Sequence, residues 1–270
     1  MFTSVEEAVP LAQSGNTTAL DYLVRQVQPK MYLLALRMLW HPEDAKDATQ
    51  EILLRIVTHL GSFRGESGFF TWAYRIGANH LSNWRKSRLE SQELTFQSFG
   101  RDLQQGLVSS LARPDEILLF QEIRIGCTLA MLLCLDRPHR LAYILGEILE
   151  MESGEASIIL EISGPTYRKR LERARRQIVT FVQSHCGLAN PSNPCRCSRR
   201  LGQALKLNRV NPRQLLFAGD RGNAEGFPQV LATIRSLEET QRAVSLYRSH
   251  PEHAVPDFAA AVRKLLGSSD

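Results

Sequence analysis

The chain has 270 residues, of which 43% are hydrophobic and 23% charged, a length and composition that allow two or more folded domains and exclude global disorder. Its net charge of +5 is moderate, but basic residues cluster at 85–88 and 168–176, which indicates two contacts with a polyanion. The N-terminus lacks a signal-peptide pattern, and the longest uncharged apolar run, around 127–135, is too short for a bilayer. We therefore expect a soluble, cytoplasmic protein without membrane contact, and five cysteines without a secretory signal argue against a disulfide framework.

The first part of the chain predicts a domain of about four helices, residues 1–88. Residues 4–38 have the apolar spacing of two helices, broken near Ser14-Gly15-Asn16, and His41-Pro42 ends the second. An acidic amphipathic helix, a loop with three glycines at 61–69 and an aromatic helix follow.

The acidic helix has two stripes at helical spacing. One stripe is apolar: Ala48, Ile52, Ile56 and Leu60. The other is mainly acidic: Asp44, Asp47, Glu51 and Leu54. One face is therefore expected to be buried and the other to present carboxylates, either as an ordinary solvated face or as a docking surface.

The aromatic helix combines rings with cations. The rings are Phe69, Phe70, Trp72, Tyr74 and Trp84, and the cations are Arg75, Arg85, Lys86 and Arg88. Unstacked nucleic-acid bases bind to such rings while cations hold the phosphates. An aromatic core is the alternative and is preferred for Phe70, Tyr74 and Leu81. A second stripe, which includes Phe69, Trp72 and Asn79, exceeds what a small core needs and favours nucleic-acid binding.

Residues 89–113 are polar and weakly periodic, which predicts a flexible linker, with a loosely packed helix pair as the alternative. Helical spacing resumes at Pro114 and carries Cys127 and Cys134 on its apolar side, where both are expected to be small buried residues. Further on, Ser153 is expected to cap a short helix that ends at Leu160, with Glu155 near the capping-box position.

The short helix precedes a turn at 162–165 and a longer basic helix. One stripe of that helix is set to pack inward: Tyr167, Leu171, Ala174, Ile178 and Val182. Its other faces are basic: Arg168, Lys169, Arg170, Arg173, Arg175 and Arg176. A short helix, a tight turn and a basic helix form the pattern of a helix-turn-helix. This pattern favours a DNA-binding helix over the alternative, a solvated basic helix. The residues expected to contact bases and phosphates are Thr166, Arg168, Lys169 and Arg173.

Three motifs in this order, DAKDATQE, FTWAYRIGAN and SGPTYRKRLERAR, resemble those of bacterial RNA polymerase sigma factors of the extracytoplasmic-function group, over roughly residues 5–183. The resemblance implies an all-α chain with a region 2 bundle (1–88) and a region 4 helix-turn-helix (114–183). It implies that an acidic set docks on the clamp helices of the polymerase β′ subunit: Asp44, Asp47, Gln50 and Glu51, with Leu54 beside them. It also implies a contact of the chain with the β flap.

The resemblance also implies that the 61–69 loop and the aromatic helix hold the opened minus-ten promoter box. The implied residues are Phe69, Trp72, Tyr74, Arg75, Asn79, Arg85 and Lys86. The helix around 166–175, with Arg170 among its residues, would bind the minus-thirty-five box. Three departures from the family pattern are Glu161 in place of a turn glycine, Ala156-Ser157 in place of Ile-Ala, and Asn83 in place of Asp.

Residues 184–204 are expected to be a cysteine-rich loop with four candidate metal ligands: His185, Cys186, Cys195 and Cys197. Their spacing is not that of a common zinc finger, and adjacent His185 and Cys186 cannot easily share one tetrahedron. A zinc site, a redox-responsive thiol cluster and a plain surface loop remain open, and no cofactor is assigned.

Residues 205–270 predict a small helical extension, with helices at 230–250 and 258–266. Such a tail could restrain the DNA-binding parts of the chain or bind a regulator such as an anti-sigma factor. The function expected overall is non-enzymatic: directing core RNA polymerase to promoter DNA. The alternatives are a helix-turn-helix regulator that does not bind polymerase and, less favoured, a thiol or zinc enzyme, for which no general base accompanies the cysteines.

Overall fold

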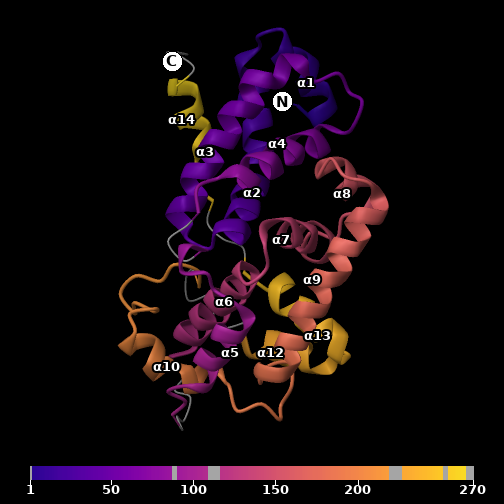
Figure 1. The fold of residues 1–270 in the computed structure, drawn as a ribbon. Helices are drawn as coiled ribbons and strands as arrows, with labels where there is room; N and C mark the ends of the chain where they lie inside the picture. Colours follow the sequence, from indigo (N-terminus) through magenta and orange to yellow (C-terminus); the bar gives the residue numbers. More distant parts are fainter. Residues whose placement is uncertain (1, 87–89, 109–115, 219–226, 252–254, 266–270) are drawn as a thin grey trace. The chain divides into compact units, whose positions relative to one another are not determined.

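The computed structural model describes residues 2–86, 90–108, 116–218, 227–251 and 255–265, and within these ranges it contains helices and no strand (Figure 1). The expected all-α fold is confirmed. The chain divides into two compact units, and neither is continuous in sequence. The first unit takes residues 1–87, 151–168 and 255–270, and the second takes 88–150 and 169–254.

The first unit is a bundle of the N-terminal helices with two later helices added. Its helices are α1 (Val5–Gln13), α2 (Thr17–Leu39), α3 (Pro42–His59), the short 3-10 turn η1 (Leu60–Ser62), α4 (Phe69–Asn83), α8 (Ser153–Ile159) and α14 (Phe258–Leu265). Helix α8 packs on α4, and α14 packs on α2 and α3 (Figure 1).

The breaks between these helices follow from local chemistry. Gly15 has a φ of 94°, which suits glycine, and the side chain of Asn16 accepts the N–H of Ala19 at 2.9 Å and so caps α2. At the next break, the His41 side chain caps α3 and Pro42 occupies its first turn. Both predicted helix breaks are confirmed.

The core of the bundle lies between α2, α3 and α4. Its fully buried side chains include Met31, Leu34, Met38, Ile52 and Leu81. A Cβ at Gly77 of α4 would lie 2.9 Å from the sulfur of Met31, so glycine permits the close approach of α4 to α2.

The second unit contains the remaining helices. They are the 3-10 turn η2 (Glu90–Gln92), α5 (Phe96–Gln104), α6 (Ile117–Leu133), α7 (Arg137–Tyr143), a π-helical turn η4 (Ile144–Ile148), most of α9 (Gly164–His185), α10 (Cys197–Lys206), α12 (Phe227–Ser236) and α13 (Glu239–Arg248).

The segment expected to be a flexible linker contains helix α5, so that expectation is wrong for residues 96–104. Thr95 and Ser98 form a capping box at its start, and Phe99 stacks on Phe181 of α9 with ring centroids 5.5 Å apart. The capping signal is weak in the sequence because serine replaces the usual Glu or Gln at the third helical position.

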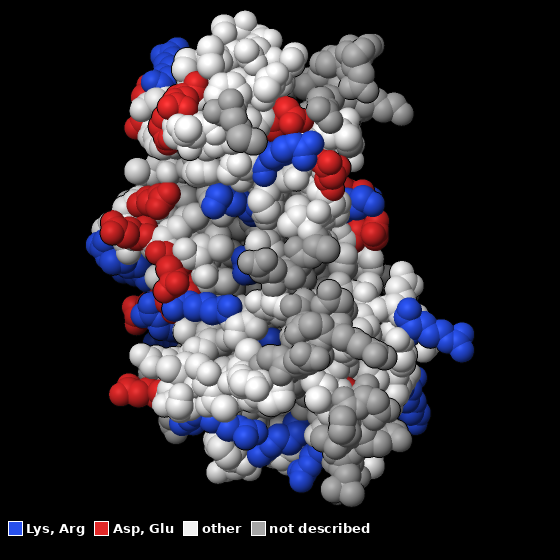
Figure 2. Space-filling model, turned by 180° about the vertical axis from the view of Figure 1, so that it is seen from behind, with Lys and Arg blue, Asp and Glu red and all other residues white. Residues whose placement is uncertain are grey.

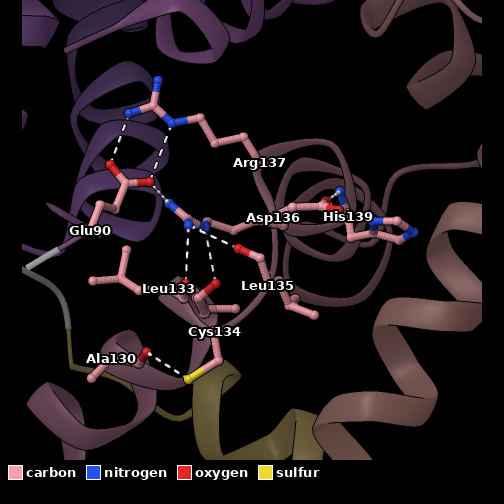
Figure 3. A network of polar contacts seen from close by, with 10 residues as sticks. Glu90, Ala130, Leu133, Cys134, Leu135, Asp136, Arg137 and His139 are labelled. Carbon is pink, nitrogen blue, oxygen red and sulfur yellow. Dashed lines mark hydrogen bonds and ion pairs between the residues drawn. The ribbon is translucent and has the colours of Figure 1, made fainter. Parts of the chain in front are cut away.

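Glu90 fixes the start of this segment within the second unit (Figure 3). Its nearly buried carboxylate accepts hydrogen bonds from Arg137 at 2.8 Å and from Arg140 at 2.7 Å. Burial alone would raise the pKa of Glu90, but the two guanidinium groups outweigh it and lower that pKa to about 2. The carboxylate is therefore charged and part of a buried ion-pair network.

The expected helix-turn-helix elements form, with one error in capping. Helix α8 begins at Ser153, but Glu152 occupies the cap position and makes no side-chain capping bond, so Ser153 is not the cap. Glu161 has a φ of 53° in the turn, the left-handed conformation for which a glycine was expected. Glutamate adopts it at a local energetic cost of about 1 kcal/mol.

The tail beyond residue 204 is an integral part of the second unit up to residue 251. The buried carboxylate of Glu122 in α6 accepts the backbone N–H groups of Leu216, Phe217 and Ala218, each at 2.8 Å. Arg124 donates to the carbonyl oxygen of Leu246 at 3.1 Å. A separate extension starting at 205 is therefore not what the structure shows.

Two further details of the tail differ from expectation. The single helix expected at 230–250 is two helices, α12 and α13, with extended backbone at Glu238 between them. The expected loop at 184–204 contains the start of α10. The compact units also cut across the expected boundaries, since 151–168 belongs to the first unit and not to a self-contained 114–183 domain.

Candidate functional site

A groove of about 630 Å³ lies between α3 and the end of α4 and collects most of the expected docking residues. Asp47, Gln50, Glu51 and Leu54 line it from α3. The carboxylate side chains are accessible, with exposed fractions of 59% for Asp47 and 54% for Glu51. Arg55 and Arg85 also line the groove, so it offers two exposed carboxylates together with two cations around an apolar side chain, and the carboxylates suit a cationic partner segment.

Asp44, the remaining carboxylate of the stripe, lies next to the groove, and Arg85 lies close both to Asp44 and to Asp47 of the groove. The Arg85 guanidinium is 3.8 Å from the Asp44 carboxylate and 3.6 Å from that of Asp47. Arg85 was expected to bind DNA, but here it pairs with the docking carboxylates, and this pairing was not anticipated.

The sequence interpretation missed His80 in the groove wall and assigned Trp84, which also lines the groove, to the rings expected to bind nucleic acid. They are four residues apart on one face of α4, and their rings are 4.9 Å apart. The His80 ring is 3.6 Å from the Glu51 carboxylate, and burial lowers the pKa of His80, so the neutral imidazole predominates at pH 7. The i, i+4 spacing of the two rings was the available signal.

Three rings expected to face an opened DNA strand are buried in this conformation. Phe69, Trp72 and Tyr74 are each at most 6% exposed. Phe63 from the 61–69 loop packs on two of them, with ring centroids 5.8 Å from Phe69 and 5.3 Å from Trp72. Burial raises the pKa of Tyr74 to about 12.

The polar residues of α4 are partly used in contacts with the α8 segment. Asn79 donates from its side chain to the Glu161 carboxylate at 2.9 Å, and Thr71 donates to Glu155 at 2.8 Å. Arg75 is half-buried, whereas Lys86 is exposed. Phe70, expected in the core, is only half-buried, and the Lys30 ammonium lies 4.8 Å from its ring centroid.

Helix α9 has the expected division into a packed and an exposed side. Tyr167, Ala174, Ile178 and Val182 are fully buried, as the apolar stripe predicts, whereas Leu171 of the same stripe is half-buried. The candidate DNA-binding residues Thr166, Arg168, Lys169 and Arg173 are exposed, and Arg170 is half-buried. Arg175 forms an ion pair with Glu147 and is thereby held within the second unit.

Charged residues of both signs lie interspersed on the face drawn in Figure 2. No single basic footprint covers that face, in agreement with the moderate net charge of +5. The exposed cations of α9 are a local candidate for DNA contact.

The cysteine-rich segment separates His185 from the candidate thiol ligands. The His185 ring stacks on Phe181 with centroids 4.5 Å apart, and its Nδ1 lies 3.1 Å from the Phe181 carbonyl oxygen. The backbones of Cys186 and Cys195 pair as an isolated parallel β-bridge, and both thiols are free. As the described side chains stand, no three His, Cys, Asp or Glu residues are grouped to hold a metal ion.

Within the described ranges, no helix has both the length and the apolar character needed to cross a membrane.

Comparisons with known proteins agree with the residue pattern. Residues 23–89 match the family model of Sigma-70 region 2. The chain is 27% identical to the RNA polymerase sigma-H factor of Pseudomonas aeruginosa, over 66% of this chain and 93% of that protein. It is 29% identical to the ECF RNA polymerase sigma-E factor of Escherichia coli K12, over 65% of this chain and 92% of that protein.

Among solved structures, the chain is similar to CnrH, solved in complex with the cytosolic domain of CnrY, with 23% identity and a TM-score of 0.47 over 66% of this chain and 96% of that one. The curated relatives are matched over nearly their whole length, whereas about a third of this chain lies outside those matches.

The region 2 match, the matches to whole sigma factors and the acidic, aromatic and helix-turn-helix motifs in sequence order agree: the chain contains a Sigma-70 region 2, is similar to sigma factors of the extracytoplasmic-function group, and directs core RNA polymerase to promoters.

Proposed function

We propose that the α3–α4 groove is the surface by which the chain holds core RNA polymerase, at the clamp helices of the β′ subunit. One observation carries the proposal: four of the five expected docking residues, Asp47, Gln50, Glu51 and Leu54, line one accessible groove. The partner that fits is a helix with basic residues beside an apolar one, since the groove combines carboxylates with Leu54 and Trp84.

Promoter DNA is proposed to bind at two places. The exposed cations of α9, with Thr166, would contact the minus-thirty-five box through phosphates and guanine edges. Arg75, Asn79, Arg85 and Lys86 would hold the minus-ten region, with Phe69, Trp72 and Tyr74 as stacking partners. Since Phe63 covers two of these rings, stacking would require the 61–69 loop to move away from α4.

The remaining contacts and properties follow from the same proposal. The chain would also contact the β flap and act in the cytoplasm, where it would meet its polymerase. It would have no catalytic activity of its own, because binding energy for unstacked bases offsets the cost of opening base pairs. An anti-sigma factor remains a candidate regulator.

The C-terminal helix is proposed as an internal restraint on the polymerase-binding bundle. The Phe258 N–H donates to the side-chain oxygen of Gln28 at 3.1 Å, and the Phe258 ring lies 6.2 Å from that of Tyr32. Phe258 and Val262 are almost fully buried there, so α14 covers part of the bundle that contains the docking helix α3.

The docking proposal is tested by capture of purified core polymerase on the immobilised full chain. The variant Asp47→Arg/Glu51→Arg should lose most of its capture, because cations would then face the cationic partner and like charges repel. The effect should weaken as salt is raised.

The matched control is Glu6→Arg/Glu7→Arg, which makes the same charge change on α1. This control should capture polymerase as the wild type does. Equal capture by wild type and the Asp47/Glu51 variant would refute docking in the groove and favour a regulator that does not bind polymerase.

A further inference from the structure

Four of the five cysteines of the second unit come from two helices, α6 and α10, and from the loop between α9 and α10. Cys186 directly follows α9, Cys195 lies opposite it in the bridge, and Cys197 begins α10. Cys127 comes from α6, far away in sequence. Burial raises the pKa of the Cys127 thiol, and the charges that Cys195, Cys186 and Cys197 could carry raise it further.

The loop that holds Cys186 and Cys195 has a fixed backbone. The Gly187 N–H donates to the Cys195 carbonyl oxygen at 3.1 Å. The side chains of Asn190 and Asn193 both donate to the Gln183 carbonyl oxygen, at 3.0 and 2.8 Å. A Cβ at Gly187 would collide with the Cys195 carbonyl oxygen, so only glycine allows this close return of the chain.

Packing of α10 on α6 brings the last two thiols to the same region. Leu201 of α10 and Phe120 of α6 form a small buried cluster, and Cys197 packs against it. Cys197 therefore lies on the side of α10 that faces α6, the helix that carries Cys127.

Burial raises the pKa of each of the four thiols, and nearby amide and guanidinium groups act in the opposite direction. Near Cys186, the groups that oppose the effect of burial on the pKa are the backbone N–H groups of Leu188 and Ala189. Arg124, Arg196 and Arg200 lie within electrostatic range of one or more of the thiols. Burial raises the pKa of Cys195 to about 11, so without another charge partner these residues remain neutral thiols at pH 7.

We propose that Cys127, Cys186, Cys195 and Cys197 form a binding site for one thiolate-preferring divalent metal ion of the zinc type. Four cysteines, one of them distant in sequence, make a closed tetrahedral set of the kind found in structural zinc sites. The backbones of Cys186 and Cys195 are paired, and Cys127 belongs to the helix on which α10 packs. The side chains are not grouped around one point, so binding requires their rotation.

This assignment replaces His185 by Cys127 as the fourth ligand. The His185 ring is stacked on Phe181 and lines a separate cavity between α5 and α9. A metal ion at the thiols would join the end of α9 to α6 and α10. The site would therefore stabilise the unit that carries most of the DNA-recognition helix, without a catalytic role.

The test uses the full chain purified under reducing conditions, and its readouts do not involve polymerase. Elemental analysis should find about one zinc per chain. Cobalt(II) added to the metal-free protein should give the thiolate-to-cobalt charge-transfer and intense visible bands of tetrahedral sulfur coordination. Cys127→Ser should weaken cobalt binding by roughly tenfold or more and reduce the charge-transfer intensity.

Two controls separate ligand loss from a general effect of substitution. Cys134→Ser and His185→Ala should keep wild-type metal content, since neither residue belongs to the set. If Cys127→Ser fails to fold, sulfur coordination numbers from X-ray absorption of the wild-type zinc protein decide between four sulfur ligands and fewer. Wild-type protein without stoichiometric metal or cobalt bands, unchanged cobalt bands in Cys127→Ser, or fewer than four sulfur ligands would overturn the proposal.

Discussion

At the scale of single residues, Arg85 belongs to both binding sites that we propose for the first unit. The sequence places it in a basic cluster suited to DNA, whereas the structure pairs it with Asp44 and Asp47. The pairs are long and Arg85 is 69% exposed, so they contribute little to folding. A polymerase cation that replaced Arg85 would release it toward DNA, so the two binding events would favour each other.

The variant Arg85→Gln should bind core polymerase about twofold to fivefold more tightly at low salt, because Asp44 and Asp47 lose an internal competitor. Fluorescence anisotropy of labelled protein titrated with polymerase measures this. The control Lys86→Gln makes the same charge change one residue later and should leave the affinity unchanged. Weaker binding by Arg85→Gln would show that Arg85 assists docking.

Glu90 gives the second unit an acid-sensitive contact. Its pKa is lowered from 4.5 to about 2, so its stabilising contribution is present above pH 4.5 and is lost as the pH falls toward 2. Glu90→Gln should lower the free energy of unfolding at pH 7 by about 3 kcal/mol. Denaturant unfolding between pH 7 and pH 2 should show the difference from wild type shrinking through that window.

The control for this experiment is Glu93→Gln, because Glu93 is exposed. It should leave both the stability and its pH dependence nearly unchanged. If Glu90→Gln lowered the free energy of unfolding by the same amount at every pH, the assigned ion-pair network would be contradicted.

At the scale of elements, periodicity and end signals predicted most helices but not all. The break at Gly15-Asn16 and the stripe of α9 were visible in sequence because each depends on local chemistry. Helix α5 was missed because its stability depends on Phe99 stacking against distant Phe181. The burial of Trp72 was missed for a similar reason, since Phe63 reaches it from the loop.

The restraint by α14 is tested at this scale by deleting residues 255–270. The deletion starts at residue 255 and not at residue 205, because a deletion from 205 would also remove the contacts of Glu122 and Arg124 within the second unit. The truncated chain should bind polymerase about fivefold more tightly, if the coupling is near 1 kcal/mol. Surface plasmon resonance with immobilised polymerase measures the affinity.

Phe258→Ala in the full chain is the companion variant, because it should release α14 without shortening the chain. Its affinity should shift in the same direction as that of the truncated chain. Unchanged affinity and promoter output in both variants would end the restraint hypothesis.

At the scale of the whole molecule, the order of motifs predicted the similarity to sigma factors, whereas the grouping of segments could not be predicted. Residues 151–168 and 255–270 join the first unit through contacts such as Thr71 with Glu155 and Gln28 with Phe258. These partners are far apart in the chain and have no shared spacing, so periodicity carries no signal for them. The same holds for Cys127 and the thiols of the tail.

The most direct measurement of the central claim is runoff transcription with purified core polymerase on promoter fragments from the source genome. The wild-type chain should produce discrete transcripts, the Asp47→Arg/Glu51→Arg variant should produce few or none, and the Glu6→Arg/Glu7→Arg control should match the wild type. Wild-type levels of transcript from the Asp47/Glu51 variant would contradict docking through the α3–α4 groove.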